Sequence, residues 1–284
     1  MLALATGSAG VGCLDSSAPV PVNPPPPPAP PPPPPVNPWP NEPPGFVVIS
    51  DYGFNDSVPA TPDAALLGLS EWWVQWNPVG NGSRGADDAA PVSAPFVYQV
   101  RYPIGFLSGL APSTLQYYLP SPFPRELYWG FWWKPSNPFQ SDGSGVNKIA
   151  FLWTQTAGVS SADLVYFALS PGPWRIRSMN DLIVGAGPTA GQSLEPNVDT
   201  TIVTLGAWHR IEIYAKYSSD SAANGVLKWW VDGQLNGAYD DLKMVQDSGF
   251  RYLQFAPTYG GNTGDVKAQT DYFWFDHTHL SRAP

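Results

Sequence analysis

Two stretches of alternating residues, joined by Asp232-Gly233, constrain the fold of this chain most strongly. In residues 208–216, and again in 225–231, apolar side chains alternate with charged or aromatic ones. A period of two places one set of side chains on the buried face of a β-strand. Asp and Gly tolerate the positive φ angles of a type I′ turn, so the pair predicts a tight hairpin. Residues 208–239 therefore predict three consecutive antiparallel strands.

Further strands are expected from runs rich in β-branched and aromatic residues, and no segment shows a helical period. These runs cover residues 46–50, 96–102, 126–134, 147–155, 164–169, 174–178, 252–256 and 271–280. Residues 51–95 are expected to be irregular, although they contain an aromatic cluster at Trp72, Trp73 and Trp76. About eleven to thirteen short strands without helices predict an all-β sandwich or barrel.

The charge and the aromatic content narrow the classes of ligand. The chain has 284 residues, a formal net charge of −9 and thirteen Trp residues. A nucleic-acid binder needs a basic surface, which this composition argues against. Large aromatic side chains fill sandwich cores or line sugar-binding grooves. No run of about twenty apolar residues occurs, so no membrane-spanning segment is predicted.

The first 18 residues resemble the end of a bacterial lipoprotein signal, in which Cys13 is the lipidated residue. Cys13 is the single cysteine, which excludes an intrachain disulfide. The segment departs from that pattern in having Gly10 where such signals usually have Leu, and in lacking Lys or Arg. The alternative is an ordinary flexible N-terminus with an incidental cysteine. A lipid on Cys13 is the one contact with a membrane that the sequence predicts.

Residues 19–45 are dominated by proline, including Pro24–Pro28 and Pro30–Pro35. Proline lacks a backbone N–H and has a fixed φ, so the segment is expected to form polyproline II. At about 3.1 Å per residue it would be a semi-rigid stalk roughly 80 Å long. The alternative is a ligand for an SH3-like or WW-like domain. Residues 46–284 are expected to be one domain, held outside the cytoplasm at a bacterial cell surface or secreted.

Several sequence segments resemble the concanavalin A-like lectin and glucanase superfamily. They are Trp-His-Arg-Ile-Glu-Ile-Tyr from residue 208, Gly-Val-Leu-Lys-Trp-Trp-Val-Asp-Gly from residue 225, Phe-Trp-Trp-Lys-Pro-Ser from residue 131 and Ala-Pro-Thr-Tyr-Gly-Gly from residue 256. The segments are most similar to a bacterial branch that is related to heparin-lyase-like and laminin-G-like proteins. This resemblance covers roughly residues 46–282 and implies a jelly-roll β-sandwich of two antiparallel sheets. It says little about activity, because this fold carries many different sites.

Enzymes of that fold need residue patterns that the chain meets only in part. The alternating acids of retaining glycosidases, Glu-x-Asp-x-x-Glu, are absent. A polysaccharide lyase needs a group that neutralises the uronate carboxylate and a base that removes the C5 proton. Arg101 is a candidate for the first role, and His277 or Tyr259 for the second. His277 and His279 are two residues apart and should share one face as a metal pair or a base, whereas His209 is interpreted as structural.

The binding interpretation uses side chains on the outer face of a sheet. In residues 126–134, Trp129 and Trp133 are expected to point into the core, and Tyr128, Trp132 and Lys134 are expected to point outward. Aromatic rings stack on sugars, and cationic side chains bind hydroxyls and carboxylates. Further candidates for sugar contacts are Tyr166, Arg175 and Arg177.

The superfamily also implies a candidate structural Ca²⁺ at Asp276 or Asp265, and no other cofactor is expected. The sequence therefore predicts a protein that recognises a polysaccharide and does not bind nucleic acid. A polysaccharide lyase on the same groove is the first alternative. A non-sugar adhesion or assembly module that uses the aromatic surface is the second.

Overall fold

The computed structural model describes residues 37–60, 71–154, 164–180, 193–219, 222–244 and 249–284. Chain contacts divide the chain into residues 1–36 and a compact unit, Asn37–Pro284. The folded unit thus begins at Asn37, before the boundary at residue 46 that the sequence predicts. The expected leader, with Cys13, and the proline stretches up to Pro35 lie outside the described residues. The described part of the chain contains no helix of the length and apolarity that a membrane crossing needs.

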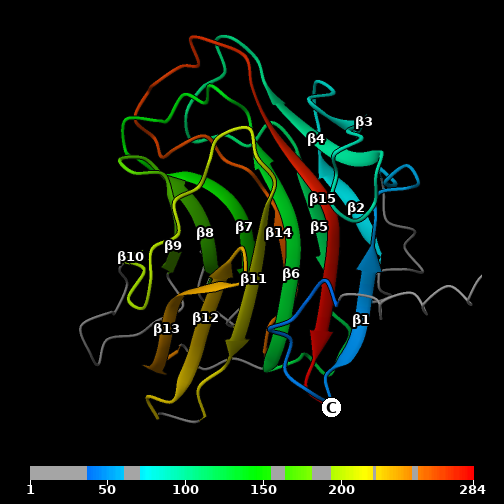
Figure 1. The fold of residues 1–284 in the computed structure, drawn as a ribbon, viewed down its shortest axis with the longest axis vertical. Helices are drawn as coiled ribbons and strands as arrows, with labels where there is room; N and C mark the ends of the chain where they lie inside the picture. Colours follow the sequence, from blue (N-terminus) through cyan, green and yellow to red (C-terminus); the bar gives the residue numbers. More distant parts are fainter. Residues whose placement is uncertain (1–36, 61–70, 155–163, 181–192, 220–221, 245–248) are drawn as a thin grey trace, which may run out of the picture. The chain divides into compact units, whose positions relative to one another are not determined.

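Two antiparallel sheets form the folded unit, as the sequence predicts (Figure 1). The eight-stranded sheet has the order β13-β12-β11-β6-β15-β4-β3, with β1 paired to β15. Its strands are β1 (Val47–Tyr52), β3 (Gly82–Ala86), β4 (Phe96–Tyr102), β6 (Glu126–Pro135), β11 (His209–Lys216), β12 (Gly225–Val231), β13 (Gln234–Leu242) and β15 (Asp271–Arg282).

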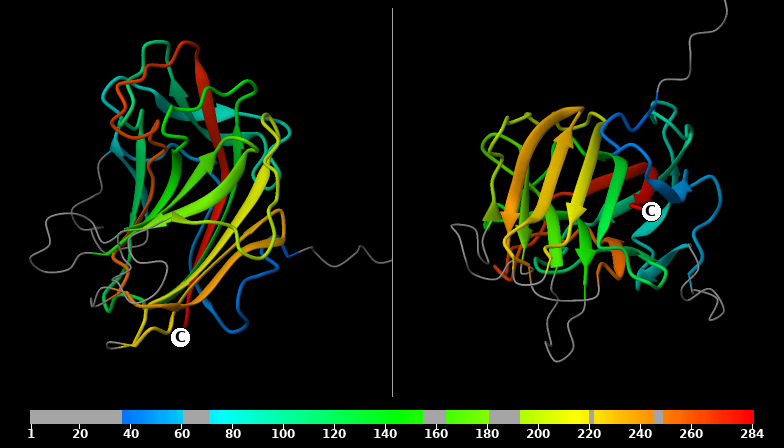
Figure 2. Two further views of the ribbon diagram at one scale, coloured as in Figure 1. Left: turned by 90° about the vertical axis from the view of Figure 1, so that its left-hand side faces the viewer. Right: turned by 90° about the horizontal axis from the view of Figure 1, so that it is seen from below.

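The seven-stranded sheet has the order β10-β9-β8-β7-β14-β5-β2. Its strands are β2 (Trp72–Trp76), β5 (Thr114–Tyr118), β7 (Asn147–Trp153), β8 (Leu164–Ser170), β9 (Arg175–Asn180), β10 (Ser193–Leu194) and β14 (Tyr252–Phe255). Figure 2 shows the two sheets as curved layers that face each other. The strand pairs among the described residues are antiparallel, in keeping with a concanavalin A-like jelly-roll β-sandwich.

The core between the sheets confirms the predicted parity of the central strands. Trp129 and Trp133 of β6 are fully buried, as are Ile213 and Trp229 of the neighbouring strands. Trp129 packs against Trp72 and Phe255 of the other sheet, with ring centroids 6.1 and 5.0 Å away. Burial of such large side chains is the main stabilising contribution in a sandwich of this kind.

The hairpin predicted at Asp232-Gly233 is present between β12 and β13. Both residues have positive φ, 53° at Asp232 and 83° at Gly233, as a type I′ turn requires. The pairing of β12 with β11 runs from Ile211–Val231 to Lys216–Val226 without a shift. This region therefore has the three-strand arrangement that the alternation predicts.

The prediction that residues 51–95 are irregular is wrong, because β2 and β3 lie there. β2 consists of Trp-Trp-Val-Gln-Trp, which shows no apolar–polar alternation because its partly exposed face also carries aromatic side chains. β3 consists of Gly-Ser-Arg-Gly-Ala, which has low intrinsic β-propensity, and its pairing with β4 holds it at the sheet edge. The formation of both strands therefore depends on pairing with neighbouring strands and not on the local sequence.

Residues 37–45 pack onto the outer face of the eight-stranded sheet and are not part of an extended stalk. Trp39 is 3% exposed, and its ring stacks on His279 of β15 with centroids 5.5 Å apart. Asn41 donates through its backbone N–H and side-chain amide to Glu212 of β11, at 3.1 and 3.0 Å. This segment thereby covers part of the sheet that would otherwise face solvent.

Candidate functional site

A stripe of five aromatic side chains crosses the outer face of the seven-stranded sheet. Trp73 of β2 stacks on Tyr118 of β5, with centroids 6.2 Å apart, and Tyr118 meets Tyr252 of β14 at 5.9 Å. Tyr252 stacks on Trp153 of β7 at 5.4 Å, and Trp153 on Phe151 at 5.9 Å. Four of these rings are partly exposed, and Phe151 is 5% exposed. We call these residues the aromatic stripe.

Strand alternation explains why the aromatic stripe faces outward. Tyr117 of β5 and Leu253 of β14 pair with each other and point into the core, so Tyr118 and Tyr252 point to the other face. Leu152 of β7 is also in the core, between the two outward-facing aromatic residues of its strand. The register between β5, β14 and β7 then brings outward aromatic side chains from adjacent strands next to one another.

Hydrogen-bonding groups lie directly beside the aromatic stripe. The Gln254 amide nitrogen donates to the Gln116 amide oxygen at 2.6 Å, across the β5–β14 pair. The indole nitrogens of Trp73 and Trp153 are buried and have no hydrogen-bond partner. Burial, followed by the charge of neighbouring Tyr118, raises the pKa of Tyr252 to about 12, so its phenol keeps its proton at neutral pH. The face therefore combines flat apolar surface with amide and hydroxyl groups.

The same face carries an arginine pair toward its β9–β10 edge. Arg175 and Arg177 of β9 both contact the carboxylate of Glu195, at 3.2 Å each. The Nε of Arg177 is buried and has no partner. Lys148 of β7 pairs across the sheet with Ala168, which in turn pairs with Arg177, so these two cationic residues belong to one outward row. Cationic side chains and the aromatic stripe thus lie on the same face of the seven-stranded sheet.

The residues of β6 that were predicted to contact sugars belong to the eight-stranded sheet, opposite the aromatic stripe. Lys134 forms an ion pair with Asp87, and its ammonium lies 4.9 Å from the Trp208 ring and 4.7 Å from the Trp274 ring. Trp132 is partly exposed beside them. Both residues have the outer parity that the sequence predicts.

Tyr128 also has the outer parity, but it is fully buried, with the His279 ring 6.2 Å away and Asn41 bonded to the same Glu212 oxygen as its hydroxyl. Its hydroxyl donates to Glu212 at 2.6 Å. The structure therefore separates Tyr128, Trp132 and Lys134 from Arg175 and Arg177, which belong to the other sheet. Tyr166 belongs to β8, and its side chain lies outside the described residues.

The three predicted lyase residues do not come together. Tyr272, the partner of Arg101 in the β4–β15 pairing, is five positions from His277 along β15, or about 17 Å at strand spacing. Tyr259 is 1% exposed, and its hydroxyl accepts a hydrogen bond from Gln140 at 3.2 Å. Burial raises its pKa to about 12. A catalytic role for these residues stays a prediction, and they do not form one site.

The two histidines of β15 do share one face, as predicted, because a β-bulge between Asp276 and Thr278 keeps both on the outer side. His277 Nε2 and His279 Nδ1 both contact Asp51 Oδ1, at 2.7 and 3.1 Å. His209 is buried with its Nδ1 2.7 Å from Asp232, as expected of a structural histidine. Each of the three histidines therefore has a carboxylate partner.

The two candidate calcium ligands lie apart from each other. The Asp276 carboxylate accepts the backbone N–H groups of Val92 and Ser93, at 2.8 and 3.0 Å. Asp265 accepts the N–H of Gly143 at 2.7 Å. Within the described ranges, no group of three His, Cys, Asp or Glu side chains is arranged to hold a metal ion. Calcium binding stays an untested prediction.

Sequence interpretation missed the aromatic stripe, although its residues are visible in the sequence. Residues 114–118, Thr-Leu-Gln-Tyr-Tyr, have the composition of a strand and were not assigned as one. Without β5 between β2 and β14, Trp73 and Tyr252 have no reason to lie near each other. The assigned strand at 147–155 did contain Phe151 and Trp153, and their shared parity was the available signal.

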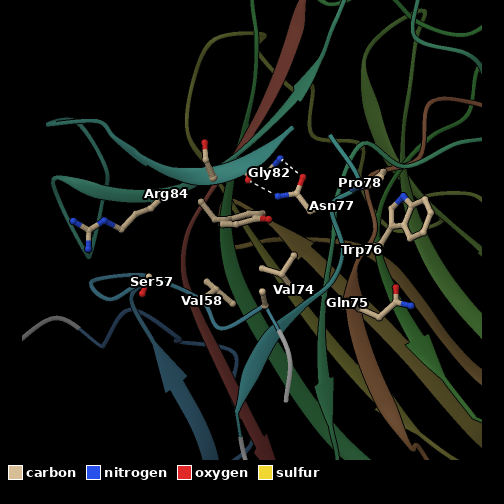
Figure 3. Close-up of a pocket in the computed structure, with 12 residues that line it drawn as sticks. Ser57, Val58, Val74, Gln75, Trp76, Asn77, Pro78, Gly82 and Arg84 are labelled. Carbon is tan, nitrogen blue, oxygen red and sulfur yellow. Dashed lines mark hydrogen bonds between the residues drawn. The ribbon is translucent and has the colours of Figure 1, made fainter. Parts of the chain in front are cut away.

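A separate hollow of about 450 Å³ lies at the β2–β3 edge (Figure 3). Val58 and Val74 point into it, and Asn77 closes one side through two hydrogen bonds to Gly82, at 2.8 and 2.9 Å. Arg84 is the one charged residue among the described residues that line the hollow, and its guanidinium donates to the Asn55 backbone carbonyl at 2.6 Å. Trp76 and Tyr98 also line this hollow, and none of its described lining residues belongs to the aromatic stripe or to the arginine pair.

Comparison with solved structures supports the fold. No protein-family model matches the chain, and no curated protein matches it. The alginate lyase Aly36B, with alginate trisaccharide bound, is 13% identical with a TM-score of 0.61, covering 82% of this chain and 98% of its own. A PL-14 alginate lyase from Aplysia kurodai is 14% identical with a TM-score of 0.55, covering 83% and 99%. The endo-β-1,4-glucuronan lyase of Trichoderma reesei is 17% identical with a TM-score of 0.51, covering 74% and 90%. The chain has the concanavalin A-like jelly-roll fold of these enzymes.

Proposed function

We propose that this protein recognises an acidic polysaccharide along the outer face of its seven-stranded sheet. The observation that carries the proposal is the aromatic stripe with the Arg175–Arg177 pair on the same face. Aromatic rings contact the apolar C–H surface of sugars. Arginine binds carboxylates well, because its planar fork matches their geometry.

The local charge favours a uronate-containing polymer over a neutral one. The chain as a whole is acidic, at −9, yet around the arginine pair Lys148, Arg175 and Arg177 outnumber the carboxylate of Glu195. A local basic patch attracts an anionic chain even when the average charge is negative. The similar structures support this direction, since by their names they act on alginate and glucuronan.

Cleavage of the polymer by β-elimination is the second candidate, favoured by the fold shared with alginate and glucuronan lyases. A lyase requires a base near the C5 proton. All three histidines of the chain belong to β11 and β15 of the other sheet. Tyr252 has a raised pKa, which suits a proton donor better than a base. Recognition is therefore the primary proposal, and Lys148 is the described residue on this face that a lyase would use as its base.

The N-terminal residues complete the proposal. A lipid at Cys13 and a polyproline stalk in residues 19–36 would hold the sandwich away from a bacterial surface, outside the cytoplasm. Such a tether suits a protein that captures a soluble or neighbouring polysaccharide. A non-sugar assembly role on the same surface remains the third candidate.

Binding and cleavage can be tested on one sample. Alginate, glucuronan and a neutral β-glucan are titrated into the purified protein by calorimetry. In parallel, the ultraviolet absorbance of unsaturated uronates is followed. Binding of the acidic polymers without an absorbance increase supports recognition, whereas an increase that Lys148→Ala abolishes supports the lyase. Absence of binding to either acidic polymer contradicts the proposal. The Arg175→Gln/Arg177→Gln double variant should lose affinity for the acidic polymers.

A further inference from the structure

The Glu195 carboxylate contacts the guanidinium groups of Arg175 and Arg177, as the carboxylate of a ligand would. Its Oε2 lies 3.2 Å from Arg175 Nη2 and 3.3 Å from Nε, and its Oε1 lies 3.2 Å from Arg177 Nη1. The Glu195 side chain is 44% exposed, whereas that of Arg177 is 16% exposed. The chain thus places its own carboxylate between the two guanidinium groups and the solvent.

The pairing is incomplete at Arg177. Glu195 meets this guanidinium through a single nitrogen, and the buried Nε has no partner. A planar guanidinium binds a carboxylate most strongly through two parallel N–H groups. An incoming carboxylate that contacts both Nε and Nη could therefore satisfy a donor that Glu195 leaves unpaired.

We propose that Glu195 is an internal competitor for the carboxylate of a bound uronate, so that it limits the affinity of this face for acidic polymers. The inference rests on the proposed function. Glu195 holds the arginine pair in the unbound protein, and a uronate carboxylate displaces it. Neutral chains carry no carboxylate for the arginine pair, so they bind without displacing Glu195.

Exchange of the carboxylates needs little reorganisation of the backbone. The β9–β10 pairing fixes Ser193 and Leu194, and the Tyr239 hydroxyl donates to the Glu195 carbonyl at 2.6 Å. The side chain can turn away while these backbone contacts persist. Partly exposed ion pairs of this kind contribute little to stability, so displacement of the Glu195 carboxylate costs little free energy.

The test measures the affinity of Glu195→Gln for a polyuronate and for the carboxyl-reduced form of the same polymer. The amide keeps the shape of the side chain and removes its charge. We expect affinity for the polyuronate to rise by up to about fivefold, the range that exposed ion pairs cover. Affinity for the reduced polymer should stay unchanged.

Glu126→Gln is the matched control, because it changes the net charge equally and lies on β6 of the other sheet, where it contacts Lys216 at 3.5 Å. A gain in both variants would mean a general charge effect and would overturn the inference. Unchanged or lower polyuronate affinity in Glu195→Gln, with an unfolding midpoint equal to that of the wild type, would also overturn it. If the wild type binds the polyuronate in those cases, the proposed function survives. If the wild type binds none, both proposals fail.

Discussion

Gly130 lies directly beneath the indole of Trp39, and a Cβ at position 130 would meet ring carbons of Trp39 at a distance that real Cβ atoms do not reach. Gly130 is the position of β6 that pairs with both Glu212 and His279. The glycine is thus what allows residues 37–45 to lie on the eight-stranded sheet and to bury its polar side chains.

The variant Gly130→Ala should lift this segment or strain the sheet. Overpacking of a well-packed site costs about 1–3 kcal/mol. We expect the free energy of unfolding, from urea denaturation, to fall by that amount, and hydrogen exchange in residues 37–45 to accelerate. Gly261→Ala is the control, since the nearest atom to its added Cβ is Ser144 Oγ at 4.0 Å. Equal stability of Gly130→Ala and the wild type would show that the segment moves away without cost.

The contact between β15 and the N-terminal segment should depend on pH. The carboxylates of Asp51 and Glu42 outweigh burial and raise the pKa of His279 above its usual value. The folded state therefore binds this proton more tightly than the unfolded state. The resulting stabilisation is fully present below about pH 6.5 and is lost as pH rises through the folded-state pKa.

Asp51→Asn should reduce this pH dependence, because Asp51 Oδ1 contacts both His277 and His279. The measurement is the thermal unfolding midpoint between pH 6 and 8 for the wild type and the variant. The difference in midpoint should be larger at pH 6 than at pH 8. Asp240→Asn, which changes an exposed carboxylate on β13, supplies the control for net charge. A difference that is constant across this range would contradict the prediction.

The aromatic stripe and the aromatic side chains on the opposite sheet should differ in their effect on binding. Trp153→Ala removes the stripe member that lies between Phe151 and Tyr252. We expect affinity for an acidic polysaccharide to fall at least about fivefold, equal to about 1 kcal/mol, as for a contact that dominates an interface. Trp274→Ala, on β15, is the matched control. A larger loss for Trp274→Ala would move the site to the other sheet.

The alternation of apolar and polar residues in β6, β11 and β12 was enough to predict the sandwich, because a period of two indicates which face of a strand is buried. The same rule assigned Tyr128 to an outer face correctly, yet Tyr128 is buried. A segment far away in sequence packs beside it, since Asn41 and Tyr128 bond to the same Glu212 oxygen, and no local pattern predicts such a contact. Because this segment is rich in proline, the sequence predicted it to be part of the stalk.

The aromatic stripe could not be predicted for a related reason. Its members come from four strands, and their contacts depend on the order β7-β14-β5-β2. This order places strands next to each other that are far apart in the chain, such as β14 and β5. Parity could identify outward residues on each strand, but only the topology shows which outward residues meet.

Lys267 and Asp271 form a fully buried ion pair whose two members should be strongly coupled. Lys267 Nζ lies 2.6 Å from Asp271 Oδ2, and both side chains have no exposure. The ammonium also lies over the rings of Phe139 and Tyr259, at 3.9 and 4.2 Å, and burial lowers its pKa to about 8. Removing one charge of such a pair leaves the other buried without compensation.

Lys267→Met should therefore lower the free energy of unfolding by about 3–5 kcal/mol. The double variant Lys267→Met/Asp271→Asn should recover much of that loss, since the amide is neutral and still accepts the N–H of Gln140, which lies 2.9 Å from Asp271 Oδ2. Urea denaturation of the wild type, both single variants and the double variant gives the coupling energy directly. Additive effects of the two substitutions would show that the aromatic rings and the Gln140 carbonyl, rather than Asp271, hold the lysine in place.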